Sequence, residues 1–335
     1  MDLFDQIFRR RSQHRFRTPE KMTENDLRSV REAVLSAVPL DPSIKTETKI
    51  VSASETSCKL GAEYCILFYS EKKGDWLRNV GYIGEQIDLL LTAGNIGTLW
   101  YGFGKTKEKK RNGLDFVIMI AVSKIPASCF RVSPSDAKRK PSEKTWSGDL
   151  DAIADVVKLS PSAVNTQPWY TECKNGTLRV FRNTKNLIMP AGVTDYFNRI
   201  DVGIYLLILE TCLSHAGLSY ERRLFADTEK TNDAKVPAAF YELRAGEEQI
   251  KRINGYENVM LDVSRALDSG DPTEDGISEK IARLEAYYGS FEWKVDFQSD
   301  EAGILPGDLK RGVLSEDGVY DLTDRYRSAV GEQER

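Results

Sequence analysis

Histidine is almost absent from this chain of 335 residues, which contains only His14 and His215. A mechanism or a metal centre built on a histidine cluster is therefore disfavoured, and we expect no bound metal. Cysteine is also sparse: the five cysteines are scattered, without a Cys-x-x-Cys pair. A zinc or disulfide framework is not indicated, and reduced packing cysteines are expected. They are Cys58, Cys65, Cys129, Cys173 and Cys212.

Long apolar runs and an excess of positive charge are missing as well. No stretch approaches the roughly 18 apolar residues of a membrane span, and the first residues, MDLFDQIFRRRSQHRF, lack the apolar core of a secretory signal. The net charge of -4 leaves no basic footprint for nucleic acid. We therefore expect a cytoplasmic protein that binds neither membranes nor nucleic acid.

What the chain does contain is a pattern of elements that occurs twice. The predicted helix ENDLRSVREAVLS is similar to GDLDAIADVVKLS, and matching Asp26 with Asp149 gives an offset of 149 − 26 = 123. The predicted core helix YIGEQIDLLLTAG is similar to DVGIYLLILETCLSHAG, and matching Gly97 with Gly217 gives 217 − 97 = 120. Two similar offsets indicate an internal duplication, although any chain that alternates helices and strands shows some such register.

The repeat predicts the organisation of the chain. Residues 1–130 form a first half with a helix over residues 5–16 and the strand-like runs KIVSAS, EYCILFYSE and DFVIMIAVSK; residues 131–147 form a basic connector; residues 148–244 form a second half with TLRVFRN and VPAAFYELR as strands. Residues 247–332 are expected to form a separate helical unit. Its predicted aromatic core consists of Tyr287, Tyr288, Phe291 and Trp293.

Two basic stretches are candidate anion sites. The run RRRS at residues 9–12 can hold a phosphate group, because guanidinium groups bind it bidentately and the hydroxyl adds a donor. A solvated basic face on a surface helix is the commoner explanation of such a run. The run KRK at residues 138–140 indicates, on its own, only a charged loop.

Two further stretches suit a flat, polar ligand. SPSAVNTQPW, residues 160–169, presents donors and acceptors of both kinds between two prolines, and its tryptophan can anchor a strand. A polar loop between a helix and a strand explains it equally well. IGTLWYGFG, residues 96–104, is expected to be a glycine-flanked turn whose N–H groups at Tyr101 and Gly102 can face a ligand, although an ordinary glycine-rich turn is the simpler explanation.

Together, IFRRRSQHRF, SPSAVNTQPW and AGNIGTLWYGFG resemble the FMN-dependent nitroreductase family, over roughly residues 1–244. The resemblance implies an α+β fold with mixed or antiparallel sheets, an FMN cofactor, and hydride transfer from NAD(P)H through flavin N5 to a small electron-poor aromatic acceptor such as a nitroaromatic or a quinone. The flavin does the chemistry, so no side chain is assigned a catalytic role. The implied cofactor-binding residues are Arg10, Arg11, Ser12, His14, Trp100, Tyr101, Gly102, Lys138, Arg139, Lys140, Pro161, Ser162, Asn165 and Gln167.

The order of the motifs departs from the family pattern. Asn-x-Gln-Pro-Trp normally follows the Arg-Arg-Ser stretch within one copy of the fold, whereas here it occurs only in the second half. Family members are usually homodimers with flavin at the interface. The resemblance therefore implies an internal pseudo-dimer with one FMN per chain between its halves, acting as a monomer. His14 stands where many members have Arg or Lys, whose charge stabilises the reduced flavin. A lower reduction potential is therefore implied here, unless Arg15 or another cation substitutes.

The C-terminal unit carries a resemblance of its own. YYGSFEW and RGVLSEDGVYDL are similar to a small, uncharacterised helical domain family, which implies a domain boundary and no activity. Two alternatives to the oxidoreductase stay open: a flavin-binding sensor or scaffold without turnover, and a specialised member that acts on flavin itself or on a halogenated aromatic.

Overall fold

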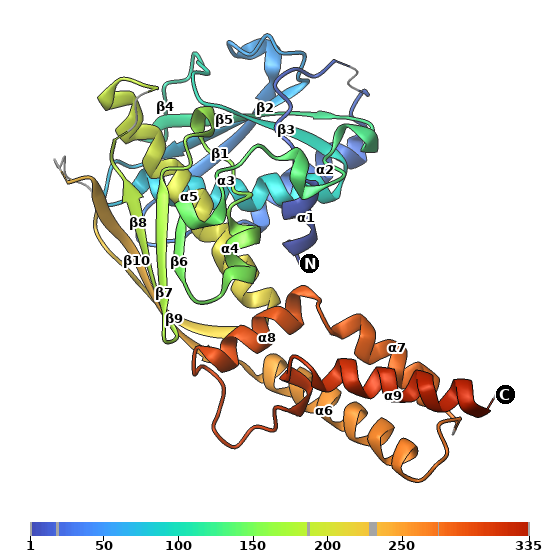
Figure 1. Ribbon diagram of the computed structural model, residues 1–335. Helices are drawn as coiled ribbons and strands as arrows, with labels where there is room; N and C mark the ends of the chain where they lie inside the picture. Colours follow the sequence, from blue (N-terminus) through green and yellow to red (C-terminus); the bar gives the residue numbers. More distant parts are fainter. Residues whose placement is uncertain (1, 18–19, 186–187, 228–232, 274, 334–335) are drawn as a thin grey trace.

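Two five-stranded sheets and two long central helices form the larger part of the molecule (Figure 1). The computed structural model describes residues 2–17, 20–185, 188–227, 233–273 and 275–333. The helices are α1 (Phe4–Arg9), α2 (Glu24–Ser36), α3 (Trp76–Ala93), α4 (Asp151–Val157), α5 (Ala191–His215), α6 (Glu247–Asp268), α7 (Ile277–Tyr287), α8 (Phe291–Glu301) and α9 (Gly318–Gln333). The strands are β1 (Thr46–Ser52), β2 (Tyr64–Ser70), β3 (Ile96–Tyr101), β4 (Lys110–Arg111), β5 (Leu114–Lys124), β6 (Trp146–Gly148), β7 (Trp169–Lys174), β8 (Thr177–Asn183), β9 (Leu218–Leu224) and β10 (Lys235–Ala245).

The two sheets share one strand order. The first runs β1-β2-β5-β3 and the second β7-β8-β10-β9, and in both a long helix follows the second strand: α3 after β2, and α5 after β8. β4 extends the first sheet beside β5, and β6 adds a parallel edge strand beside β7. The architecture is therefore mixed α+β, as expected, and both sheets are largely antiparallel.

The two central helices approach each other closely at a glycine on each. A β-carbon on Gly81 of α3 would lie 2.0 Å from the carbonyl oxygen of Ile200, and one on Gly203 of α5 would lie 2.0 Å from that of Arg78. Any side chain at either position would separate the helices, so both glycines are required. The two contacts are reciprocal and 122 positions apart (203 − 81 = 122).

The helix α2 shows how local sequence produces an element. Thr23 accepts a hydrogen bond from the backbone N–H of Asp26, and Asp26 accepts one from the N–H of Thr23, so the first turn is capped reciprocally. This hydrogen bonding, chiefly from the Thr23 hydroxyl, lowers the pKa of Asp26 to about 2. Leu27, Val30 and Ala33 then fall on one face and are buried against the first sheet.

Two local predictions for the first half are wrong. The helix expected over residues 5–16 ends at Arg9, because Arg10 turns into an extended conformation and the segment after it pairs with β3 through Ser12 and Thr98. The glycine-flanked turn expected at residues 96–104 is the strand β3 as far as Tyr101, since its β-branched and aromatic residues pair with β5. The predicted core helix begins earlier than expected, at Trp76.

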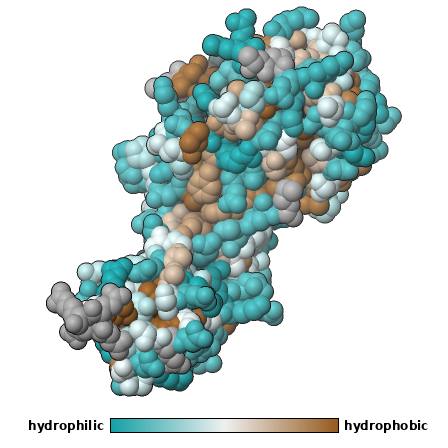
Figure 2. Space-filling view, turned by 90° about the vertical axis from the view of Figure 1, so that its right-hand side faces the viewer, coloured by the Kyte–Doolittle hydropathy of each residue, from teal (hydrophilic) through white to brown (hydrophobic). Residues whose placement is uncertain are grey.

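The helices α6 to α9 form a second lobe, at the lower left of Figure 2. This lobe has its own apolar core. A buried carboxylate, Asp296, holds this lobe together, because it accepts hydrogen bonds from Arg252, Gln249 and the hydroxyl of Tyr287. Phe291 departs from the expected aromatic core: its ring packs against Phe4 at the junction with the larger lobe. Among the described residues, no helix combines the length and the apolarity that crossing a membrane requires.

Candidate functional site

The segment after α1 is fixed by a buried arginine. The Arg10 side chain, 3% exposed, donates from Nε to Asp88 Oδ2 at 2.7 Å and from Nη2 to Ser12 Oγ at 3.0 Å. The backbone N–H of Gln13 donates to the carbonyl oxygen of Thr98, so residues 12–13 run beside β3. The basic run is therefore no solvated helix face: its central arginine points inward, toward α3.

A second carboxylate near Arg10 is exceptionally enclosed. Glu85 Oε1 lies 3.4 Å from Arg10 Nε, and Glu85 Oε2 accepts from Trp100 Nε1 at 3.2 Å. Burial raises the pKa of Glu85 to about 8, although the charge of Arg10 opposes the shift. Burial lowers the pKa of Arg10 while Asp88 and Glu85 raise it, and the net shift is upward. Arg10 is thus held as a cation between two enclosed carboxyl groups.

The connector and the loop of residues 160–168 are tied together by side chains. Arg139 Nη1 donates to Asn165 Oδ1 at 3.0 Å, and Asn165 Nδ2 donates to the Lys138 carbonyl at 2.8 Å. The Gln167 side chain, 2% exposed, accepts from the backbone N–H of Lys140 at 2.9 Å. Because these groups hold each other, the two segments form one wall of the site.

The same loop has a strained backbone. Val164, Asn165 and Gln167 all have positive φ angles, at 44°, 59° and 48°. Such angles are rare outside glycine, and for the β-branched Val164 this is a true outlier. Strain of this kind persists only where the surroundings over-determine it, and it is concentrated at binding sites.

The C-terminal lobe supports the helix that leads into this loop. α4 begins at Asp151 after Leu150, which has φ of 61° and supplies no side-chain cap. Instead, Gln298 of α8 accepts a hydrogen bond from the backbone N–H of Ala152 at 3.1 Å. The lobe thereby satisfies a free N–H group at the start of α4.

A cationic cavity of about 430 Å³ lies between these segments. Five cationic side chains and one carboxylate, that of Asp136, line it. Burial, reinforced by the charge of Arg10, lowers the pKa of Arg131 to about 10 and that of Arg139 to about 10. Within the described part of the chain, neither Arg131 nor Arg139 forms an ion pair. The lining residues are Arg10, Arg11, Ser12, His14, Arg131, Asp136, Ala137, Lys138, Arg139, Pro161, Ser162, Val164 and Asn165.

A second cavity, of about 290 Å³, adjoins the first and is mainly apolar and aromatic. A β-carbon on Gly102 would lie 2.8 Å from the ring of Phe197, so the wall is closely fitted at that point. The rings of Phe103 and Phe197 meet edge to face, with centroids 5.3 Å apart. The lining residues are Ser12, His14, Leu60, Leu99, Trp100, Tyr101, Gly102, Phe103, Ile118, Pro161, Ser162, Ala163, Val164, Met189, Phe197, Ile200, Asp201 and Ile204.

The structure brings together twelve of the fourteen predicted site residues. Ser12, His14, Pro161 and Ser162 line both cavities; the other eight line one, and they are Arg10, Arg11, Trp100, Tyr101, Gly102, Lys138, Arg139 and Asn165. Lys140 and Gln167 line neither of the two. The Lys140 ammonium group donates to the carbonyl oxygens of Thr166 and Gln167. Lys140 and Gln167 therefore stabilise the loop without lining either cavity.

Sequence reasoning missed Arg131 and Asp201. Arg131 donates to the carbonyl oxygen of Ile7 at 3.3 Å, and Asp201 lies on the cavity face of α5. The signal for Arg131 was its place in the basic connector. Asp201 had a weaker signal, as a lone carboxylate at the start of the apolar run from Val202 to Leu209.

Two family models match the chain. A family model described as "Putative TM nitroreductase" matches residues 2–212. The chain belongs to this nitroreductase family. A second model, described as a domain of unknown function (DUF4298), matches residues 273–333. Both resemblances predicted from the sequence are thereby confirmed.

Three solved structures show how far the likeness extends. A "putative nitroreductase" of Thermotoga maritima is 22% identical; the match covers 72% of this chain and 94% of that chain, with a TM-score of 0.49. A nitroreductase family protein of Clostridium difficile is 11% identical over 43% of this chain and 96% of that chain (TM-score 0.34). A "Putative NADH dehydrogenase/NAD(P)H nitroreductase" of Parabacteroides distasonis is 12% identical over 37% of this chain and 87% of that chain (TM-score 0.29). None of the curated proteins matches the chain.

Proposed function

We propose that this nitroreductase-family chain is an FMN-dependent oxidoreductase, which passes hydride from NAD(P)H to a small electron-poor aromatic acceptor by a ping-pong mechanism. One observation carries the proposal: a cationic cavity opens into an aromatic one, and Ser12, His14, Pro161, Ser162 and Val164 line both. A ligand with a phosphate at one end and a flat ring system at the other matches this pair of cavities.

The charge of the first cavity fits a phosphate. Its arginines and its lysine outnumber its one carboxylate, and the burial of Arg131 and Arg139 beside Arg10 leaves positive charge that an anion would offset. Arginine forks suit phosphate oxygens, and the Ser12 hydroxyl adds a donor. Arg10 itself is held by Asp88, so we assign it a positioning role beside Arg11, Arg131 and Arg139.

The second cavity fits the ring system. The absence of a side chain at Gly102 lets the ring of Phe197 pack against the backbone there, and Trp100 and Phe197 supply apolar walls. When bound there, FMN would supply the hydride-accepting and hydride-donating chemistry. The chain's own residues would bind and orient it and would exclude water, and the exposed His14 lines both cavities where they meet.

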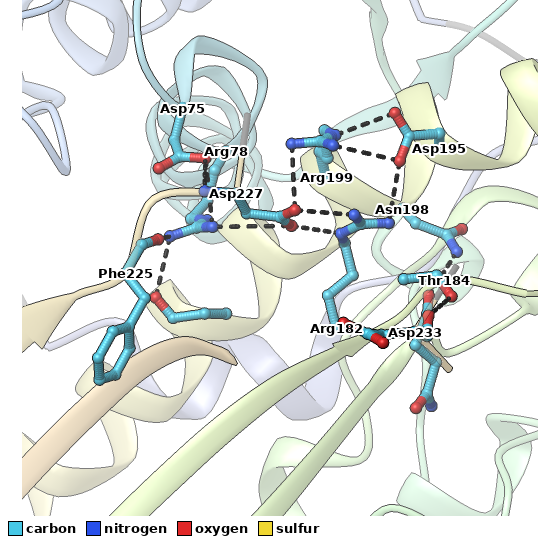
Figure 3. A network of polar contacts seen from close by, with 12 residues as sticks. Asp75, Arg78, Arg182, Thr184, Asp195, Asn198, Arg199, Phe225, Asp227 and Asp233 are labelled. Atoms are coloured by element: carbon cyan, nitrogen blue, oxygen red, sulfur yellow. Dashed lines mark hydrogen bonds and ion pairs between the residues drawn. The ribbon is translucent and has the colours of Figure 1, made fainter. Parts of the chain in front are cut away.

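We further propose that the two halves arose by duplication and that one of two equivalent sites survives. The shared strand order and the reciprocal glycine contact support the duplication. With the same spacing of 122, Phe197 and Ile200 of the aromatic cavity correspond to Asp75 and Arg78. There the Arg78 side chain, 2% exposed, is enclosed by Asp75, Asp227 and the carbonyl of Phe225 (Figure 3). In the first half, a buried charge network therefore occupies the position that corresponds to the wall of the aromatic cavity in the second half.

Flavin content tests this proposal directly. The absorbance spectrum of the purified protein, before and after acid release, should show about one FMN per chain, because the surviving site draws on both halves of the chain. Two FMN per chain would refute the proposal that the second site has been lost. If the protein holds no FMN even after incubation with FMN, the proposal that it is an FMN-dependent oxidoreductase is refuted. Oxidation of NADH or NADPH by the loaded protein then separates the enzyme from a sensor without turnover. Because both halves contribute to the site, a monomer suffices.

A further inference from the structure

A carboxyl group lines the apolar cavity without a counter-charge. Asp201 lies on α5 and is 3% exposed. Both of its carboxyl oxygens lie 3.1 Å from the backbone nitrogen of Ala163, in the loop that also lines this cavity. No ion pair to Asp201 occurs in the described ranges of the chain. A buried carboxylate that accepts from a single N–H group is strongly disfavoured relative to the neutral acid. Burial accordingly raises the pKa of Asp201 well above its ordinary value, despite the opposing hydrogen bond.

The other half of the chain shows what this position needs for structure alone. Asn79, 122 positions before Asp201, accepts from the backbone N–H of Asp41 at 3.0 Å, and Asp41 is 122 positions before Ala163. The same loop-to-helix hydrogen bond is therefore made there by a neutral amide. Because an amide suffices for this contact, the loop-to-helix hydrogen bond does not require a carboxyl group at position 201. What the carboxyl group adds is a proton that can be transferred.

The surroundings of Asp201 keep that proton available to a bound molecule. Ile200, Ile204 and Phe197 lie beside it on the cavity wall and limit access of water. Besides Asp201, the ionisable groups among the described residues that line this cavity are those of His14 and Tyr101. His14 lies on the segment after α1, and Tyr101 lies at the end of β3. His14 is exposed, so its protons exchange with bulk water. Asp201 is the one carboxyl group among the residues that line this cavity.

We propose that Asp201 is the acid that protonates the acceptor when this acceptor is a quinone or a similar carbonyl compound. The inference rests on the proposed function, in which NAD(P)H is the reductant. A quinone that accepts a hydride gains two electrons and one proton, and a second proton is needed to complete the hydroquinone. In this step the O–H bond of Asp201 breaks and an O–H bond forms on the quinone oxygen. The Asp201 carboxylate then regains a proton from water. Proton transfer by a positioned acid contributes about 10²–10⁴-fold to a rate.

The variant Asp201→Asn tests this, because Asn79 shows that the amide preserves the loop contact. The FMN-loaded protein is assayed with NAD(P)H and either menadione, which must be protonated, or ferricyanide, which accepts electrons alone. We expect kcat with menadione to fall about a hundredfold. We expect KM for menadione to change little, because the amide can still donate a hydrogen bond, and the ferricyanide rate to stay at the wild-type level. Equal losses with both acceptors, or no loss with menadione, would overturn the proposal.

Infrared spectroscopy gives a second readout that needs no turnover. The difference spectrum of wild type minus Asp201→Asn should contain the carbonyl stretching band of a protonated carboxylic acid, sensitive to deuterium exchange and shifted when menadione binds. Glu85→Gln provides a reference for another enclosed carboxyl group, whose pKa burial raises to about 8. No such band, or a band that menadione leaves unmoved, would show that Asp201 does not hold or share the proton. If wild type oxidises no NAD(P)H, the proposed function fails, and the band still decides the state of Asp201.

Discussion

Arg139 Nη1 lies 3.0 Å from Asn165 Oδ1, and this hydrogen bond joins the connector to the loop in the wall of the cationic cavity. Both residues belong to motifs singled out in the sequence. They play different parts, since Asn165 fixes the position of the guanidinium group whereas Arg139 brings the charge. The Nη2 of Arg139 also donates to the carbonyl oxygen of Leu159 at 3.1 Å, so its orientation is set from two sides.

Arg139→Gln should weaken FMN binding about ten- to hundredfold, because hydrogen bonds to charged groups contribute about 1.5–3 kcal/mol. Asn165→Ala should weaken it less, since the positive charge remains. Arg28→Gln, on the exposed face of α2, serves as a matched control that removes an arginine far from the cavities. Equilibrium titration of the flavin-free protein with FMN measures all three. Unchanged affinity in Arg139→Gln would remove Arg139 from the phosphate site.

Val164→Asn should raise the free energy of unfolding by about 1 kcal/mol, because asparagine tolerates the left-handed conformation that costs other residues about 1–2 kcal/mol. Val164 is 55% exposed, so little packing is lost. Val132→Asn is the matched control: this valine is 91% exposed and its φ is not positive, so its substitution should change stability by less than about 0.5 kcal/mol. Urea unfolding measures both. Equal effects at the two positions would show that the backbone of residue 164 stores no strain.

Arg78→Met should destabilise the fold by about 3 kcal/mol or more, because removing one member of a buried charge network leaves its partners unpaired. Arg78 Nη1 donates to the carbonyl oxygens of Phe225 and Ala238, and Arg182 and Asp227 form the adjoining ion pair (Figure 3). A loss of this size would show that the charge network around Arg78 stabilises the fold.

The control for this variant is Arg223→Met, which removes an exposed arginine from the strand β9. It should lower the free energy of unfolding by less than about 1 kcal/mol. Chemical unfolding of both variants, without flavin, separates this effect from ligand binding. A small loss in Arg78→Met, comparable to that in Arg223→Met, would contradict the structural role.

Elements with strong local signals could be predicted from the sequence. Thr23 and the spacing of Leu27, Val30 and Ala33 specify α2, and the run TLRVFRN is the strand β8 to the residue. The end of α1 could not be predicted locally. Arg10 leaves the helix to reach Asp88, 78 positions away, and no helical propensity encodes that contact.

The site shows the same division between local and distant information. The motifs at residues 9–12, 138–140 and 160–169 were recognisable because each is a short run of unusual composition. Arg131 and Asp201 were not, because each is a single residue in an ordinary stretch. Their surroundings come from α1 and from the loop at Ala163, so their roles exist only in the folded chain.

His215 should make the junction between the two lobes sensitive to pH. Its ring stacks on Phe4, with centroids 3.8 Å apart, and it lies between the carboxylates of Asp2 and Glu292. The hydrogen bond to Glu292, opposed by burial and assisted by Asp2, raises the pKa of His215 above 6.5. The hydrogen bond from His215 lowers the pKa of Glu292 to about 2. The stabilisation due to protonated His215 is therefore complete below pH 6.5 and is lost as the pH rises through the raised folded value.

His215→Phe keeps an aromatic ring against Phe4 and removes the titration. We expect the difference in unfolding free energy between wild type and His215→Phe to be largest at mildly acidic pH and to shrink as the pH rises. Glu292→Gln should reduce this pH dependence without abolishing it, because Asp2 remains. Urea unfolding of the full chain across this pH range measures the difference directly. A difference that stays constant with pH would mean that folding leaves the pKa of His215 unchanged, and that the two carboxylates do not stabilise its protonated form.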